Sequence, residues 1–488
     1  MAAVFDVDPE DCSAAILRLV EIGFSEASVC RHLGLQDFSE FQWRAAAIYR
    51  QEQLAEGAPL DLAIELFLLQ GSLRERQLDQ VFGSAEKSAL LRCGILGQKE
   101  NAFFARASLY PVGSELVFSD HSNHELDATV VDIDLKDRVM YVGTDSRWLA
   151  RATVRKPIES MLDLCCGSGI HALLATRQAV CVTAVDINPR AVRCTSFNAK
   201  LKGSKHLEAL LGDLYEPIGE RQFDLITANP PFVPAPAQEV GFRDGGSNGE
   251  AVQRRIVEGI PRHLAKGGIA QIVTELGESD SDRLEQRLRT WLGNAPIDVH
   301  VARLRNHSAE AYAIGHAKGE DCGSFIESVG RWANNLKLHG YSRVVSVLLA
   351  FKWSHTSPWS RVDDARPPTR EVGEEIAALF EVERFVREPD LKVQLRAKSF
   401  VRTGPLALFE ARTLGAPVAP KCVARLFGLS MSVEHALDQL EIDLLTEFER
   451  SRATRDVLTL TNQANLPEET VLDSIASLLR KGFLREAS

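Results

Sequence analysis

From residue 160 onward, short apolar runs alternate with amphipathic segments along the chain. The runs have the length of buried strands, and the segments between them place apolar residues at helical spacing. Strands that alternate with helices predict a parallel, doubly wound α/β sheet, in which ligands bind at the carboxyl ends of the strands. The expected strands are Met161–Cys165, Val180–Val185, Leu207–Leu211, Phe223–Ala228 and Ile269–Val273.

Beyond the fifth strand the pattern becomes less regular. We expect Ile297–Leu304 and Ala311–Ile314 to form an antiparallel pair that closes the sheet. Phe325–Leu338 has helical spacing, and Val344–Phe351 is an apolar strand. Residues 353–372 carry three prolines among charged residues, which predicts a linker or a surface loop.

The pattern divides the chain into five parts. A helical N-terminal domain spans residues 1–110, and a β-rich lead-in spans residues 111–150. The α/β domain covers residues 151–352 and the linker or loop residues 353–372. A helical C-terminal domain covers residues 373–488. The strands expected in the lead-in are Glu115–Phe118, Ala128–Ile133 and Val139–Val142.

The two flanking domains end in a shared pattern. Leu90–Leu96 and Leu478–Leu484 both read as the end of a helix, a glycine and an apolar strand. That pattern is typical of the third helix of a winged-helix unit running into its wing. Such units often bind DNA, whereas the alternative is a packing module with no ligand. The flanks are therefore predicted to be winged-helix-like, and a nucleic-acid partner is a weakly supported alternative.

Composition narrows the class of protein, its cellular compartment and its partners. With 488 residues and 45% hydrophobic residues, the chain is expected to be a soluble protein of about three folded units at ~100–200 residues each. We expect neither a membrane span nor a targeting segment. The nine scattered cysteines predict free thiols in the cytoplasm and no metal site. A formal charge of −11 disfavours a nucleic-acid partner without excluding a local basic patch.

The strongest candidate chemistry lies where the fourth strand ends, at Asn229-Pro230-Pro231-Phe232. Two prolines remove two backbone donors, so the strand must stop there. The rigid turn then presents the Asn229 amide and backbone carbonyls beside the flat Phe232 ring. Two acceptors and an aromatic face suit a planar –NH2 group.

Other strands end in residues suited to a nucleotide-like cofactor. The turn Gly167-Ser168-Gly169 follows the first strand and lets a ligand lie against the backbone at a helix start. Asp186 ends the second strand, where a carboxylate can accept from ribose hydroxyls. NAD-dependent oxidoreductases and methyltransferases share these two features. Asp213 closes the third strand, where a carboxylate can accept from an adenine amino group, and no feature indicates hydride transfer.

Taken together, four motifs resemble those of the class I S-adenosylmethionine-dependent methyltransferases, whose core is Rossmann-like. They are Asp163–Gly169, Asp186–Ala191, Gly212-Asp213 and Asn229–Phe232. The branch with Asn-Pro-Pro-aromatic methylates planar nitrogens. The second motif and Asp244–Gly249 are particularly similar to the glutamine-amide methyltransferases of peptide release factors, and base-amino methyltransferases of ribosomal RNA share all four motifs. The resemblance covers about residues 140–315.

The resemblance implies a role for each matched position in binding S-adenosyl-L-methionine. Asp163 and Gly167 would hold its methionine end, Asp186 its ribose and Asp213 its adenine. Cys165 departs from the family pattern, which has glycine there, so the methionine end is expected to lie slightly differently. The expected cofactor-binding residues are Asp163, Cys165, Gly167, Gly169, Asp186, Ile187, Asp213, Leu214 and Asn229.

The resemblance also implies a catalytic set. The side chain of Asn229 and the carbonyl of Pro230 would accept the N–H bonds of the acceptor, and Phe232 would stack on its plane. Residues 233–249 follow this turn as a loop suited to cover the substrate. The acceptor is left open between a protein side chain, a nucleic-acid base and a small metabolite. A small-molecule methyltransferase is the alternative function, and an oxidoreductase or a non-catalytic cofactor-binding protein is a remote one.

Overall fold

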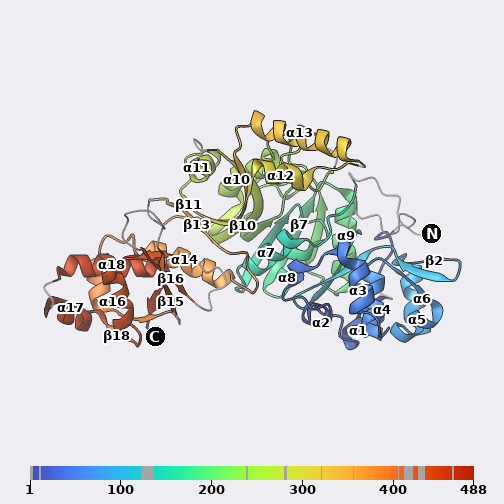
Figure 1. Ribbon diagram of the computed structural model, residues 1–488, viewed down its shortest axis with the longest axis horizontal. Helices are drawn as coiled ribbons and strands as arrows, with labels where there is room; N and C mark the ends of the chain where they lie inside the picture. Colours follow the sequence, from blue (N-terminus) through green and yellow to red (C-terminus); the bar gives the residue numbers. More distant parts are fainter. Residues whose placement is uncertain are drawn as a thin grey trace.

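The computed structural model places the α/β domain between an N-terminal and a C-terminal unit (Figure 1). Within the part of the chain that it describes, no helix is both long and apolar enough to cross a membrane. The described residues are 4–9, 12–121, 137–237, 240–279, 283–319, 321–355, 357–404, 406–411, 421–426, 435–463 and 466–487.

An eight-stranded sheet forms the centre, in the order β13-β11-β12-β10-β9-β6-β7-β8. The five strands from β10 to β8 run parallel, which confirms the doubly wound core. Each corresponds to a run expected from the sequence. Their bounds are β6 Ile158–Leu164, β7 Ala179–Asp186, β8 Leu207–Leu211, β9 Phe223–Ala228 and β10 Leu264–Glu278.

The sheet is closed by antiparallel strands other than those expected. β12 (Arg343–Trp353) lies between β10 and β11 (Ile297–Ser308) and is antiparallel to both. The expected partner Ala311–Ile314 is wrong, since it lies within helix α12 (Ala309–His316), where the Ser308 side chain accepts from the Ala311 N–H at 3.2 Å. β13 (Ser360–Asp364) lies within the segment expected to be a linker and pairs in parallel with β11.

Helices cover both faces of the sheet because its strands carry apolar residues on both sides. Leu162 and Ile226 pack with α10 and α11 on one face, whereas Met161 and Leu225 pack with α7, α8 and α14 on the other. The covering helices are α7 Thr144–Ala152, α8 Ile170–Ala175, α9 Pro189–Leu201, α10 Ala251–His263, α11 Leu284–Leu292 and α14 Gly373–Phe385.

In the lead-in, β4 (Ser108–Val112) and β5 (Glu115–Ser119) pair as a two-stranded sheet. The expected strand Glu115–Phe118 is therefore confirmed, whereas Val139–Val142 has no regular secondary structure. The expected strand Ala128–Ile133 lies outside the described residues.

The N-terminal unit ends in a small sheet with strand order β1-β3-β2. Helix α6 precedes β2, and Gly94 between them has φ of 72°, which favours glycine. The unit consists of α1 Ser13–Glu21, α2 Glu26–His32, η2 Phe38–Glu40, η3 Trp43–Ala45, α3 Ala46–Glu52, α4 Pro59–Phe67, β1 Ser72–Arg74, α5 Glu75–Val81, α6 Ser84–Arg92, β2 Leu96–Lys99 and β3 Ala102–Ala105.

The C-terminal unit contains short strands beside its helices. Helix α18 runs through Gly482, with φ of 76°, into β19, and β14 pairs with both β18 and β19. The elements are α15 Leu391–Ala397, β14 Ser399–Arg402, β15 Leu406–Ala411, β16 Lys421–Leu426, β17 His435–Leu437, α16 Gln439–Glu447, β18 Arg452–Ala453, α17 Thr454–Gln463, α18 Glu468–Arg480 and β19 Leu484–Glu486.

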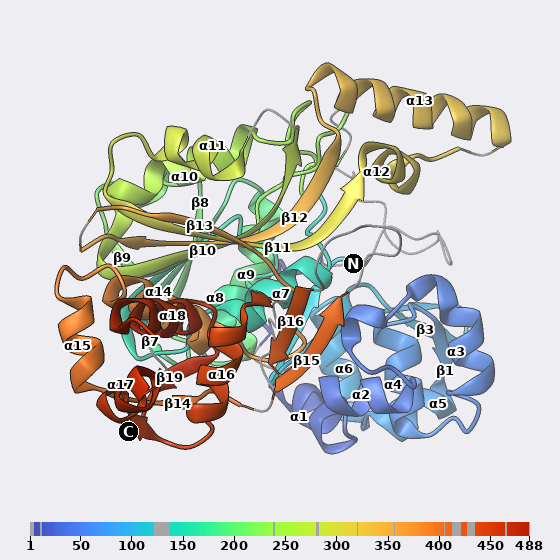
Figure 2. The ribbon, with the colours of Figure 1, turned by 60° about the vertical axis from the view of Figure 1, so that its left-hand side comes forward.

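An insertion between β11 and β12 stands over one edge of the core. It consists of α12 and α13 (Cys322–Leu338), and Figure 2 shows α13 extending beyond the sheet. Its inner face packs on the chain just after the Asn-Pro-Pro-Phe turn, where Trp332 and Leu336 meet Val233 and Ala235. The Asn335 side chain donates to the Pro234 carbonyl at 3.1 Å. The insertion is therefore tied to the loop that follows the candidate site.

Candidate active site

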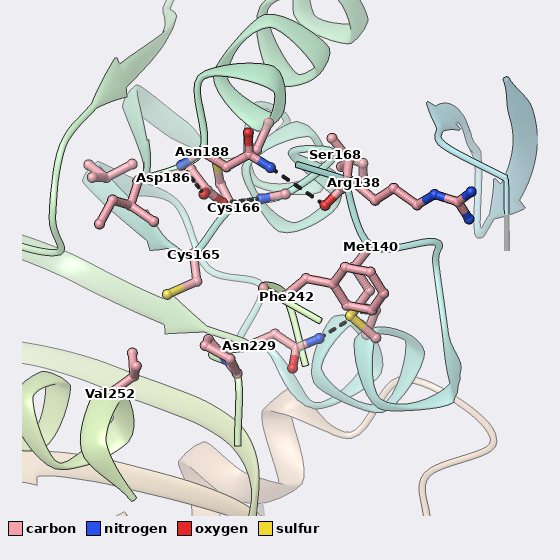
Figure 3. A pocket seen from close by; sticks show the side chains of 18 of the residues that line it. Arg138, Met140, Cys165, Cys166, Ser168, Asp186, Asn188, Asn229, Phe242 and Val252 are labelled. Carbon is pink, nitrogen blue, oxygen red and sulfur yellow. Dashed lines mark hydrogen bonds between the residues drawn. The ribbon is translucent and has the colours of Figure 1, made fainter. Parts of the chain in front are cut away.

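A cavity of about 310 Å³ lies at the carboxyl ends of β6, β7, β8 and β9. Most of the expected cofactor-binding residues line it together, although they come from four separate strand ends. Figure 3 shows Asp186 and Asn188 on one side and Asn229 on the other, with Cys165 and Phe242 between them. The expected residues in the lining are Cys165, Gly167, Asp186, Ile187, Asp213, Leu214 and Asn229.

The turn after β6 needs a left-handed backbone at three places. Cys165, Gly167 and Gly169 have φ of 55°, 55° and 79°. A Cβ at Gly169 would come within 2.7 Å of Thr195, whose hydroxyl donates to the Gly167 carbonyl at 3.1 Å. The left-handed φ of Cys165 explains why glycine suits that position. Gly169 therefore allows the turn to pack closely against Thr195, although it is not one of the residues found in the cavity lining.

Asp163 lies below the cavity rather than in its lining. Its side chain is fully buried, accepts from the Thr227 hydroxyl at 2.8 Å and accepts from the Ala172 N–H at 3.2 Å. Burial raises the pKa of this carboxyl to about 7, against the lowering effect of both hydrogen bonds. Asp163 thus joins β6, β9 and the start of α8, and its geometry fits support of the glycine turn.

Asp186 ends β7 with both carboxylate oxygens held by the backbone. One oxygen accepts from the Gly167 N–H and the other from the Asn188 N–H, each at 2.9 Å. Each oxygen has a further lone pair for a ligand hydroxyl. Burial raises the pKa of Asp186, and these backbone hydrogen bonds oppose the rise. The next residue, Ile187, is 69% exposed yet lines the cavity, so it offers an apolar face to a ring.

The residues after β8 complete this side of the cavity. Asp213 accepts from the Arg255 guanidinium at 2.9 Å, so its carboxylate is shared between an ion pair and the cavity. Leu214 is nearly buried and has φ of 52°, which turns the chain along the cavity wall. An adenine amino group would therefore meet Asp213 together with Arg255.

Asn229 has its amide orientation fixed from α7. Its Nδ2 donates to the Ser146 hydroxyl at 3.1 Å and to the Asp145 carboxylate at 3.3 Å. Its Oδ1 is buried and has no hydrogen-bond partner among the described residues. A buried acceptor without a partner is costly, so this oxygen is set up to receive an N–H from a ligand. Burial raises the pKa of Asp145, which the Asn229 hydrogen bond opposes.

A second cavity of about 280 Å³ adjoins the first and contains the other predicted catalytic residues. Pro230 and Phe232 line it, and Met140, Tyr141 and Phe242 line both cavities. The turn between the cavities is braced by a glycine loop. A Cβ at Gly245 would lie 2.8 Å from the Pro231 carbonyl, and one at Gly249 would lie 2.5 Å from the Phe232 carbonyl.

The second cavity also contains residues that sequence reasoning did not select. Trp148 and Asp145 come from α7, and Glu275 comes from the end of β10. Glu275 is partly exposed and accepts from the Tyr312 hydroxyl at 2.6 Å, and desolvation raises its pKa. The position of Glu275 at a strand end was an available signal. In the sequence, Asp145 and Ser146 read only as a polar turn that can cap the following helix.

His171 is a further missed residue, in the first cavity. It is 5% exposed, and neither ring nitrogen has a hydrogen-bond partner among the described residues. Burial lowers the pKa of its imidazole to about 3, so the ring is neutral. It lies two residues beyond Gly169, on the helix that the glycine turn begins. Its sequence signal was therefore its place in the first turn of that helix.

Part of this chain is similar to known methyltransferases. The family model described as "Methyltransferase small domain" matches residues 142–293. Methyltransferase HEMK2 of Homo sapiens is 32% identical over 146 residues, which are 27% of this chain and 67% of that protein.

Two further relatives carry glutamine in their names. The ribosomal protein uL3 glutamine methyltransferase of Bradyrhizobium diazoefficiens is 36% identical over 134 residues, 25% of this chain and 41% of that protein. The release factor glutamine methyltransferase of Geobacter sulfurreducens is 30% identical over 135 residues, 25% of this chain and 47% of that protein. The chain thus spans less than half the length of these two relatives.

Proposed function

We propose, because the chain belongs to the class I S-adenosylmethionine-dependent methyltransferases of the Asn-Pro-Pro-aromatic branch, that it methylates the side-chain amide nitrogen of a polypeptide. Relatives named as glutamine methyltransferases support an amide acceptor. The preferred acceptor is therefore a glutamine side chain.

One observation carries the proposal, the buried Oδ1 of Asn229 without a partner at the junction of the two cavities. Ser146 and Asp145 occupy the amide's donor side, so the acceptor side is the one presented. Asn229 is found in the lining of the first cavity, and Pro230 and Phe232 in that of the second. An –NH2 group in the second cavity would therefore reach its acceptors at the boundary with the first.

The first cavity fits S-adenosylmethionine in chemistry as well as in place. Asp186 offers lone pairs to ribose hydroxyls, Ile187 an apolar face to the adenine ring, and Asp213 an acceptor to its amino group. Gly167 leaves room for the methionine end beside the turn. When bound, the cofactor supplies an electrophilic methyl group on sulfur.

The chain's own residues would orient the acceptor nitrogen. Asn229 Oδ1 and the Pro230 carbonyl would accept its two N–H bonds, which leaves the nitrogen lone pair less conjugated with the carbonyl and directed at the methyl group. Phe232 stacks on that plane and fixes its direction. Methyl transfer forms the N–C bond and breaks the S–C bond, and the nitrogen then loses one proton to solvent. Positioning and fixed dipoles supply most of the rate.

A label-transfer experiment tests this function. The full chain would be incubated with methyl-labelled S-adenosylmethionine and a cell extract, which is then separated into protein, RNA and small-molecule fractions. We expect label in protein, recovered after proteolysis as N5-methylglutamine. Asn229→Ala should lower transfer at least ~100-fold because it removes the oriented acceptor. Its affinity for S-adenosylhomocysteine should fall far less than its rate of methyl transfer, as measured by calorimetry.

The matched control is Asn294→Ala, the same change at an exposed asparagine beyond α11. It should leave both transfer and cofactor affinity unchanged. Full transfer by Asn229→Ala would contradict the proposed role of that residue. Label confined to RNA or to small molecules would contradict the proposed acceptor.

We also propose that both flanking units are winged-helix-like. Each has a helix that ends at a left-handed glycine and turns into a strand of a three-stranded sheet. The cap hydrogen bonds are alike, from Ile95 N–H to the Leu90 carbonyl and from Phe483 N–H to the Leu478 carbonyl. In the C-terminal unit, the middle strand β14 precedes the helices instead of following them. Such units would orient the acceptor protein or pack against the core.

A further inference from the structure

The acceptor cavity continues outward under the α12–α13 insertion. A third cavity of about 200 Å³ adjoins it, and both are lined by Arg243 and His316. The third cavity also contains Lys318, Arg331 and Trp332, which the insertion supplies. We call the two connected cavities the acceptor groove. Its inner end is at Pro230 and Phe232, and its outer end is at Lys318 and Arg331.

Several cations of the groove form no ion pair with the described carboxylates. Arg305, Lys318 and Arg331 are exposed and form no ion pair within the described part of the chain. Many other arginines of this protein, whose net charge is −11, do lie beside carboxylates, for example Arg147 beside Glu26 and Arg190 beside Asp120. Arg305 instead lies over the Trp148 ring, with its guanidinium carbon 4.7 Å from the ring centre. Lys318 and Arg331 therefore remain available to an anionic ligand, whereas Arg305 also interacts with Glu275.

Stacked rings form the wall between the inner and outer ends of the groove. The rings of Tyr312 and His316 are stacked with centres 4.0 Å apart, and His316 and Trp332 follow at 5.0 Å. Arg243 lies above Trp332 and pairs with the buried Asp244 at 2.6 Å. This packing holds the wall rigid, so Lys318 and Arg331 lie at a fixed place relative to the catalytic turn.

The carboxylates of the groove lie at its inner end and are already engaged. Asp145 holds the Asn229 amide, and Glu275 accepts from Tyr312 and from Ser346. Asp244 is occupied by Arg243. The groove thus changes character along its length, from a polar inner end suited to an amide to a cationic outer end suited to a carboxylate.

We infer that the acceptor groove binds a polypeptide segment in which an acidic residue lies close to the methylated amide. Lys318 and Arg331 would bind the acidic side chain while the amide enters the inner end. The inference rests on the proposed function and adds a sequence preference to it. Two cations without an ion pair, Lys318 and Arg331, suit one or two carboxylates, whereas a nucleic-acid strand needs a long basic stripe.

Peptide binding tests the inference directly. Fluorescein-labelled short peptides would each carry one central glutamine, with flanks of glutamate on one side, glutamate on the other, alanine only, or lysine. The full chain, saturated with S-adenosylhomocysteine, would be titrated into each and followed by anisotropy. Two exposed ion pairs should make one glutamate series bind roughly five- to thirtyfold more tightly than the alanine series at low salt.

A charge reversal provides the decisive variant. Lys318→Glu combined with Arg331→Glu should abolish the preference for glutamate and create one for lysine flanks. The matched control, Lys99→Glu combined with Lys337→Glu, changes the net charge equally at exposed sites away from the groove. It should keep the wild-type preference. Unchanged preference in the groove variant, or equal binding of all peptides by the wild type, would overturn the inference.

The failure of this inference differs from the failure of the proposed function. If peptides are methylated without regard to charge, the function stands and the acidic preference falls. If glutamate peptides bind with the predicted swap but no glutamine is methylated, the groove assignment stands and the acceptor amide is wrong. Tighter binding of a single-stranded RNA than of any peptide, lost in the groove variant, would overturn both in favour of a nucleic acid.

Discussion

At the scale of single residues, Asp163 shows that a residue of a binding motif can stabilise the site without lining the cavity. The sequence places this carboxylate in a cofactor motif, and the structure buries it under the turn, between Thr227 and Ala172. Burial raises its folded-state pKa to about 7, against about 3.9 in an unfolded chain. The folded protein therefore binds more protons than the unfolded chain between these two values.

This shift predicts a specific pH dependence of stability. A folded-state pKa above the unfolded value contributes stability that is present at pH 4 and is lost as pH rises towards 7. Asp163→Asn removes the ionisation, so the variant should gain stability relative to the wild type from pH 5 to pH 8, by roughly 2–4 kcal/mol. Urea denaturation of both proteins across this range measures the difference. A constant difference at all pH values would contradict the prediction.

At Cys165, in contrast to Asp163, the sequence alone indicates a local structural requirement. The sequence marks it as a departure from glycine, and the left-handed backbone there gives the reason for glycine. Burial raises the pKa of the Cys165 thiol, so the group stays protonated in the cavity. A neutral thiol is a weak nucleophile, so Cys165 does not compete with the acceptor for the methyl group.

At the scale of elements, helix α7 connects the N-terminal unit to the catalytic amide. Its first turn carries Asp145 and Ser146, which hold Asn229. The residue after Ser146 is Arg147, which is 1% exposed and pairs with Glu26 of α2 at 3.1 Å. Burial lowers the pKa of Arg147 to about 10, although Glu26 opposes this. The N-terminal unit therefore helps to set the position of the amide.

Removing the Glu26 charge should affect both stability and catalysis. Glu26→Gln leaves Arg147 buried without its carboxylate, which should cost about 3–5 kcal/mol of unfolding free energy. Methyl transfer should fall further than cofactor affinity, because α7 orients Asn229. The control Glu21→Gln removes the partner of Arg18 in an exposed pair on α1 and should cost less than about 1 kcal/mol. Urea denaturation and label transfer measure both effects, and equal losses in the two variants would contradict the coupling.

The sequence predicts elements where local pattern decides them. The five parallel strands are short apolar runs, and the site residues at their ends follow from that topology. β13 escapes prediction because Ser360–Asp364 is polar and is held by distant partners, such as His300 with Asp363 at 3.0 Å. The Ser146–Asn229 contact joins residues 83 positions apart, so no local pattern reveals it.

At the scale of the whole molecule, one buried carboxylate joins the C-terminal unit to the central sheet. Glu383 of α14 is 3% exposed and accepts from Arg361 of β13 and from Arg387, each at 3.1 Å. Arg480, at the end of α18, lies 3.6 Å from the same carboxylate. Three arginines from the sheet edge, the connecting helix and the C-terminal unit thus meet at this carboxylate, and Arg361 also pairs with Asp363 at 2.7 Å.

Loss of that charge should release the C-terminal unit while leaving the cavities intact. Glu383→Gln leaves three cations around a neutral amide, so their repulsion and desolvation should weaken the junction by about 3 kcal/mol. Hydrogen exchange should then become faster in α18 and β19, whereas affinity for S-adenosylhomocysteine should not change. The matched control Glu381→Gln, two residues away and 45% exposed, should alter neither, since it belongs to a surface pair with Lys352. Unchanged exchange in Glu383→Gln would mean that apolar packing between α14 and α18 holds the unit in place without this ionic junction.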